Sequence, residues 1–314
     1  NVITSIVFTP QITFSDNSIQ STAWLGNASV ASYFNSFANV RLGQGAGSGA
    51  TGIQTVAIGY NAGLNVQYSG AIAIGYQAGQ FNQGSNSIAI GYQAGFTGQN
   101  SNSIAVGYQS GLTNQNTNSV AVGPAAGQDF QGTQAVAIGN GAGQTQQSSG
   151  AVAIGYQAGQ GTQGVDAISI GSTAGQISQS ANAISIGSGA GQNSQGIQGI
   201  AIGYQAANIG QDVNGIAIGA LSGASYQGFG AVAIGQGAGY NTQGQFAVAI
   251  GATSGYNNQG SSSVSIGYAS AYNNQNVFAV AVGSNAGYTN QAGYATAVGV
   301  LAGNTTQGPY SVAI

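Results

Sequence analysis

Hydrophobic and polar positions recur along this chain with a period of sixteen residues. The sequence Ala71-Ile72-Ala73-Ile74-Gly75 returns in close variants, and its last residue, which we call the reference glycine, recurs seventeen times from Gly43 to Gly299 without insertion or deletion. So strict a period predicts a solenoid, in which each repeat is one coil that is stabilised by stacking on its neighbours. We therefore expect residues 40–314 to form an all-β solenoid of about seventeen 16-residue coils.

The residues before each reference glycine alternate between large and small. Ile or Val stands one and three residues before it, with Leu42 and Thr296 as departures, and Ala or Ser stands between them in every coil except the first, which has Arg41. Because alternate side chains of a strand point to opposite faces, this pattern predicts one branched face and one small face. We expect the branched face to form the interior of the coil, and the small face to let another surface approach closely.

The residues after each reference glycine predict tight turns. A small residue follows three positions later and a second Gly four positions later, with Ala207 and Ala271 as exceptions to the second Gly. Glycine allows the positive φ angles that sharp reversals need. A coil of sixteen residues with two reversals has room for two short strands, which predicts a flattened parallel β-roll.

A Gln stands eight residues after the reference glycine in all sixteen full repeats. Stacked amides bond to one another in parallel sheets, so this column predicts a structural amide ladder, with a ligand-binding row as the alternative. Its first members are Gln67, Gln83, Gln99, Gln115, Gln131 and Gln147.

Tyrosines fill two further columns over four successive coils each. Neighbouring rings one coil apart can stack, which contributes about 0.5–1.5 kcal/mol per pair. Stacking for stability is one interpretation, and a glycan-facing aromatic stripe is the other. The tyrosines are Tyr60, Tyr76, Tyr92 and Tyr108 in one column, and Tyr240, Tyr256, Tyr272 and Tyr288 in the other.

Residues 1–39 lie outside the repeat and form a separate N-terminal segment in our prediction. Residues 12–20 alternate and then break at a Ser-Asp-Asn-Ser turn, which predicts a short β-hairpin. The segment either caps the first coil or attaches the chain to another subunit by donating a strand. Its candidate attachment residues are Ile12, Phe14, Ile19 and Trp24.

The charged residues exclude several classes of function. Only Arg41, Asp16, Asp129, Asp166 and Asp212 are charged, and the chain has no Lys, Glu, His, Cys or Met. One cation cannot neutralise a row of phosphates, so we expect no nucleic-acid partner. The aspartates of the repeat lie in different coils at different offsets, and no His or Lys is present to activate a nucleophile. We expect no enzyme activity, no catalytic residues, no metal site and no cofactor. No apolar run is long enough for a membrane-spanning helix.

Two segments resemble known families. The phrases Ser87-Ile88-Ala89-Ile90-Gly91 and Ser119-Val120-Ala121-Val122-Gly123, each followed by a small-residue turn, resemble the head repeat of the trimeric autotransporter adhesins, the YadA-like or Hep-Hag repeat. The resemblance covers residues 40–314. It implies a left-handed β-roll in a homotrimer on a cell surface, bound to host glycans or proteins, with the small Ala/Ser face as a hypothetical contact between chains. Residues 12–23 are similar to segments of phage and large-virus fibre proteins.

These observations predict a non-enzymatic fibre or adhesin rod on a cell or virion surface that mediates or presents attachment. The rival within structural proteins is an extracellular filament subunit that polymerises end to end through residues 1–39. A glycan-binding or ice-binding solenoid is the alternative from another class, although Thr is scattered over many columns.

Overall fold

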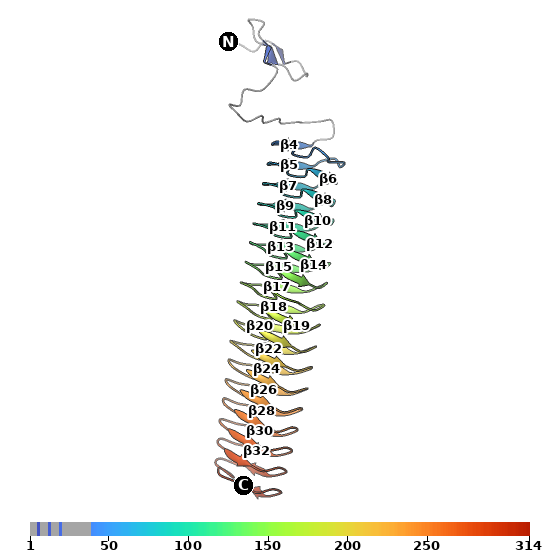
Figure 1. The fold of residues 1–314 in the computed structure, drawn as a ribbon. Helices are drawn as coiled ribbons and strands as arrows, with labels where there is room; N and C mark the ends of the chain where they lie inside the picture. The colour runs from blue at the N-terminus through green and yellow to red at the C-terminus, as the bar shows by residue number, and fades with distance from the viewer. Residues whose placement is uncertain (1–4, 7–11, 14–18, 21–38) are drawn as a thin grey trace.

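The repeat folds into a long parallel β-solenoid (Figure 1). The structure, a computed structural model, describes residues 5–6, 12–13, 19–20 and 39–314, and all regular elements among them are strands. One coil corresponds to sixteen residues, since Ile72, Ala73 and Ile74 pair in parallel with Ile88, Ala89 and Ile90. The all-β solenoid of about seventeen 16-residue coils is therefore confirmed.

Three short strands precede the roll: β1 (Ser5–Ile6), β2 (Ile12–Thr13) and β3 (Ile19–Gln20). They pair antiparallel, with Ser5 opposite Thr13 and Ile12 opposite Gln20, as the hairpin prediction requires. Phe14 and Trp24 lie outside the described residues, so the attachment role of this segment stays a prediction.

Each coil of the roll contributes to two sheets, and the first sheet carries the Ile-Ala-Ile phrase. It runs without a break from one end of the roll to the other. Its strands are β4 (Val40–Leu42), β5 (Val56–Ile58), β7 (Ile72–Ile74), β9 (Ile88–Ile90), β11 (Ile104–Val106), β13 (Val120–Val122), β15 (Val136–Ile138), β17 (Val152–Ile154), β18 (Ile168–Ile170), β20 (Ile184–Ile186), β22 (Ile200–Ile202), β24 (Ile216–Ile218), β26 (Val232–Ile234), β28 (Val248–Ile250), β30 (Val264–Ile266), β32 (Val280–Val282), β34 (Thr296–Val298) and β35 (Val312–Ala313).

The second sheet ends each strand on the recurring Gln. Between β16 and β19 it continues through Gln163, which bridges Gln147 and Gln179. Its strands are β6 (Asn65–Gln67), β8 (Phe81–Gln83), β10 (Thr97–Gln99), β12 (Thr113–Gln115), β14 (Asp129–Gln131), β16 (Thr145–Gln147), β19 (Ile177–Gln179), β21 (Asn193–Gln195), β23 (Ile209–Gln211), β25 (Ser225–Gln227), β27 (Asn241–Gln243), β29 (Asn257–Gln259), β31 (Asn273–Gln275) and β33 (Thr289–Gln291).

The interior of the roll is lined by small residues and glutamine, so the predicted orientation of the first sheet is wrong. Ala73 and Ala89 are fully buried, whereas Ile90 of the branched face is 37 % exposed. The physical reason is lack of space. A Cβ added at Gly95 would lie 3.2 Å from Ala89 Cβ and 2.7 Å from Gln99 Oε1, so a branched side chain does not fit between the sheets.

The inward position of the Ala/Ser face also overturns the hypothesis that this face meets a neighbouring chain. Where Ser replaces Ala there, its hydroxyl finds a partner inside the same roll. Ser169 donates to Gln179 Oε1 at 2.7 Å, and Ser185 donates to Gln195 Oε1 at 2.6 Å. The small face therefore closes the core of one chain.

The reference glycines are required by both conformation and space. Gly155 has a φ of 130°, and a Cβ there would lie 2.6 Å from the carbonyl oxygen of Gly171 in the next coil. Its own N–H donates to the Ile138 carbonyl of the previous coil at 2.8 Å. Because the turns as well as the strands bond from coil to coil, the roll is one continuous ladder.

Candidate functional site

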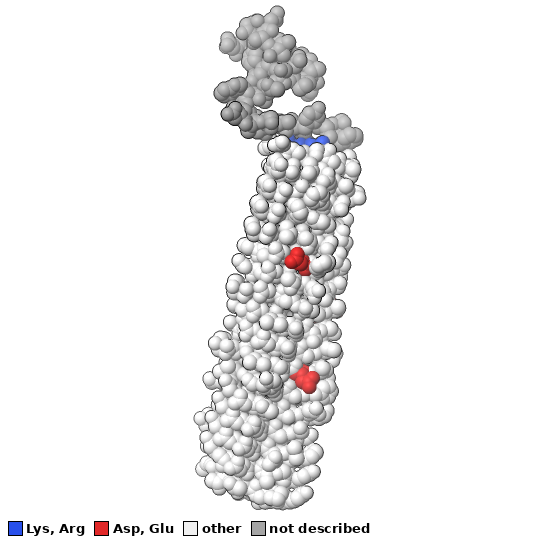
Figure 2. Space-filling model, viewed as in Figure 1, with Lys and Arg blue, Asp and Glu red and all other residues white. Residues whose placement is uncertain are grey.

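The acidic side chains are isolated on the surface of the roll. Figure 2 shows them as separate patches along the roll, with a basic side chain at its N-terminal end. Within residues 39–314 and the three short N-terminal strands, no three His, Cys, Asp or Glu side chains come together as a metal site would require. Asp129 accepts a hydrogen bond from Thr113 Oγ1 at 2.9 Å, and Asp212 accepts one from the Val213 N–H at 2.7 Å. These contacts are local and do not build an acid–base pair.

Membrane insertion through a helix has no candidate in the described part of the chain. No helix long and apolar enough to cross a bilayer occurs there.

From Gln83 onward the glutamine column forms the predicted amide ladder inside the roll. Gln67, predicted as its first member, donates to the Val56 and Ala71 carbonyls but not to Gln83. The Gln131 side chain is fully buried; its Nε2 donates to the Val120 carbonyl at 2.8 Å and to Gln147 Oε1 at 3.1 Å. From Gln83 to Gln307, every glutamine donates to the next in this way. Because each amide also bonds the opposite sheet, the ladder ties the two sheets together. Its burial leaves no access for a ligand, so the structural interpretation holds.

The first tyrosine column forms an exposed stack. The ring centroids of Tyr60, Tyr76, Tyr92 and Tyr108 are separated by 5.1–5.3 Å, and adjacent planes differ by at most 13°. Each ring therefore covers the face of its neighbour and presents mainly its edge to solvent. A sugar that stacks on aromatic faces finds an open face only at the two ends of this stack. Glycan binding here stays a prediction.

The second tyrosine column is stacked more closely and is half-buried. Tyr240, Tyr256 and Tyr272 have centroids 4.8–4.9 Å apart and planes within 5°. Burial raises the pKa of the Tyr256 phenol above its ordinary value of 10.0, and the neighbouring Tyr240 and Tyr272 add to this rise. These contacts fit the stabilising role that the sequence predicts.

The outer surface of the first sheet is uniform along the described part of the roll. We call it the Ile/Val face and define it as the side chains one and three residues before each reference glycine, from Val56 to Val298. The residues directly before the glycine, such as Ile170 and Ile186, are 37 % exposed, and those three before it are half-buried. No charged residue interrupts either row. The sequence pattern predicts these branched residues in the core and therefore does not indicate this surface.

The outer surface of the second sheet is irregular. The middle residue of its strands points outward and varies along the roll, as in Asn82, Phe130, Ser194, Gly210 and Tyr226. The four non-glycine residues among them have side chains of different sizes, and each has a positive φ. A short uniform row occurs only near the C-terminal end of the described strands, where Asn258 donates to Asn274 and Asn274 donates to Asn290, each at 3.1 Å.

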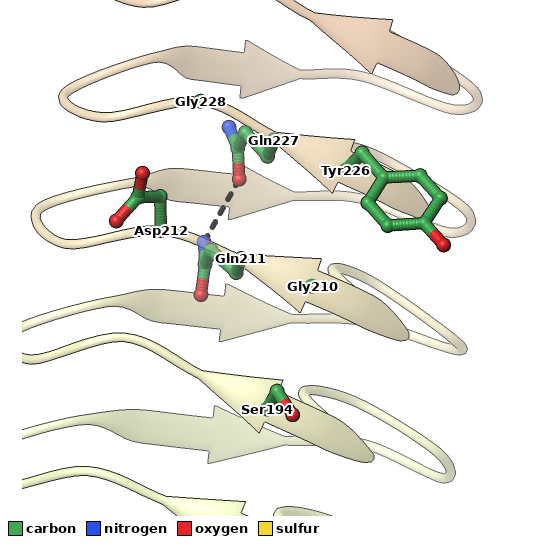
Figure 3. A pocket seen from close by; sticks show the side chains of 7 residues that line it. All are labelled: Ser194, Gly210, Gln211, Asp212, Tyr226, Gln227 and Gly228. Carbon is green, nitrogen blue, oxygen red and sulfur yellow. Dashed lines mark hydrogen bonds between the residues drawn. The ribbon is translucent and has the colours of Figure 1, made fainter.

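The irregular side has two shallow hollows. One lies where Gly210 leaves space between Ser194 and Tyr226 (Figure 3). Tyr226 and Asp212 extend to opposite sides of it, so no set of polar groups converges on one point. The second hollow lies beside Phe130 and Gly132. Each hollow lies beside a glycine, Gly210 in the first and Gly132 in the second.

Comparison of the chain with family models, curated proteins and solved structures finds no match to any of them.

Proposed function

We propose that the protein is a non-enzymatic structural rod that spaces or presents an attachment function on the surface of a cell or virion. The observation that carries this proposal is the unbroken ladder of equal coils over residues 40–314. With coils about 4.8 Å apart, seventeen of them give a rod of about 80 Å. Backbone, glutamine and tyrosine ladders all run along the same axis, which favours a stiff element of fixed length.

The chemistry of the surface supports the same proposal. Within the described residues the acidic groups are isolated, and the hollow beside Gly210 has no polar groups that converge on one point. A reaction site would need such convergence. The Ile/Val face instead consists of two extended rows, which fit contacts with another extended surface.

Electron microscopy of the native material, combined with surface labelling, tests this function. We expect straight rods about 80 Å long for the roll, and labelling of intact source cells or particles by antibodies raised against it. Labelling that requires permeabilisation would refute the surface location. Continuous fibres in place of separate rods would favour the end-to-end filament, in which residues 1–39 join successive subunits.

A further inference from the structure

The Ile/Val face has the size and chemistry of a protein interface. A strip about 80 Å long and about 10 Å wide has an area of about 800 Å². The largest apolar patch on a typical monomer is about 300–600 Å², and a standard interface covers about 800 Å² per partner. Left in water, this face would be an aggregation hazard along the whole rod.

Covering this face leaves no backbone group without a partner. Its strands already bond to the coils on either side, as in Val152 N–H to the Ala167 carbonyl at 2.9 Å. The outward side chains are aliphatic, apart from Thr296 at one end. Because no polar group has to be stripped of water, apolar burial is opposed by little desolvation cost.

We infer that the Ile/Val face is covered by the same face of a second copy of this chain, with the rods parallel around an axis along their length. A surface of evenly spaced branched rows is matched best by a surface of the same spacing and length, and another copy has both. Two such sheets can interdigitate their side chains at about 10 Å separation. This inference names a partner and a face, and it does not depend on where the rod is displayed.

Aromatic residues on the two borders of the Ile/Val face indicate the relative direction of the two copies. One border is the residue directly after each reference glycine, and the other is the residue five before it. Within a coil an aromatic occurs on only one of the two borders. The first border has Tyr60, Tyr76, Tyr92, Tyr108, Tyr156, Tyr204 and Tyr268, and the second has Phe246, Phe278 and Tyr294.

Parallel copies bring unlike borders together at the same level. Tyr76 of one copy then lies over Gly70 of the other, and Phe278 lies over Ser284. Each exposed ring meets a smaller residue along the whole rod, which is the complementarity that close packing needs. If the copies were antiparallel and overlapped over their full length, each border would face the same border of the other copy. Tyr76 of one copy and Tyr268 of the other would then compete for the same space. The placement of the aromatics therefore favours parallel rods.

Charged substitutions on the outer surfaces of the two sheets test whether the Ile/Val face mediates association. Ile186→Lys with Ile218→Lys puts two cations in the middle of the Ile/Val face, and Ser178→Lys with Ser194→Lys puts the same charge on the outer surface of the second sheet. We expect sedimentation velocity to show an oligomer for the parent and for the serine variant. The isoleucine variant should associate at least 100-fold more weakly and keep its β-type circular dichroism. A monomeric parent at about 50 μM, or equal association of both variants, would overturn the inference.

A distance measurement tests the direction without touching the face. The chain has no cysteine, so Asn290→Cys on the second sheet accepts a single nitroxide label. In parallel copies the labels lie within about 40 Å of each other, whereas in antiparallel copies they lie about 70 Å or more apart. Electron double resonance is expected to give the shorter distance. The longer distance, or no measurable distance in a sample that sediments as an oligomer, contradicts parallel packing. Rods seen by microscopy in either case would leave the structural function standing.

Discussion

The two sheets of the roll share one repeat and one interior, yet their outer surfaces differ. Ile and Val recur almost without change on the outside of the first sheet, whereas the outward residue of the second sheet varies from Gly210 to Tyr226. Both sheets nevertheless keep their parallel pairing over the whole rod. The fold therefore depends on the residues that point inward, and the uniformity of the Ile/Val face is what the inferred contact with a second copy would explain.

The largest effect is expected from enlarging an inward residue. Ala153 is fully buried between the sheets, while Val152, next to it on the same strand, points outward. We expect Ala153→Ile to lower the free energy of unfolding by about 3 kcal/mol, because the interior has no room for the added carbons. Val152→Ile is the matched control and should change it by less than about 0.5 kcal/mol. Equal effects in denaturant titrations would contradict the assignment of the two faces.

A smaller loss should follow from interrupting the glutamine ladder. Gln131→Leu removes the bonds to the Val120 carbonyl and Gln147 and deprives Gln115 of its acceptor. We expect a loss of about 2 kcal/mol in the free energy of unfolding, since buried amides are left without partners. The neighbouring Gln146 is exposed, so Gln146→Leu should change stability by less than about 0.5 kcal/mol. A tolerated Gln131→Leu would show that the ladder contributes little.

The exposed tyrosines allow the stability contributed by a stacked ring to be compared with that of an unstacked ring. Tyr76 stacks on a ring at either side, whereas Tyr156, which is also exposed, belongs to none of the tyrosine stacks described above. Tyr76→Ala should cost about 1 kcal/mol more than Tyr156→Ala, because two stacked contacts are lost. Thermal unfolding of the two variants measures the difference. If both variants melt alike, the stack does not stabilise the roll, and glycan-array binding lost only in Tyr76→Ala would then favour a binding role.

The smallest effect is expected from pH. No side chain with an ordinary pKa between about 5 and 9 is present, so the melting temperature should be nearly constant in that window. The folded-state pKa of Tyr256 is raised, so its contribution to stability is complete below pH 10.0 and is lost as pH rises through the folded-state pKa. Stability should therefore decline only above about pH 10, and Tyr256→Phe should reduce that decline. A shift of many degrees between pH 5 and 9 contradicts this.

The repeat length, the two strands per coil and the glutamine ladder were predictable from sequence because each follows from spacing. Gly155 and its equivalents fix the turns, and Gln131 and its equivalents occupy one column from Gln67 to Gln307. These features depend on contacts between equivalent residues of adjacent coils. The sixteen-residue period shows which residues those are.

The orientation of the first sheet was not predicted, because branched apolar residues usually fill cores. The sequence did contain a contrary signal. The position between the branched residues admits only Ala or Ser after the first coil, whereas the branched positions also accept Leu42 and Thr296. A strict upper limit on size indicates a confined position. The proposed contact of the Ile/Val face with a second copy could not be predicted from the repeat, because the period describes only neighbours within one chain.

The coil-to-coil bonding of the roll has a consequence for how its length is set. Each coil bonds only to the coils directly before and after it, as Gly155 does to Ile138. Loss of one sixteen-residue unit would bring two equivalent surfaces together and shorten the rod by about 4.8 Å. The number of repeats therefore sets the length of the rod, in steps of one coil.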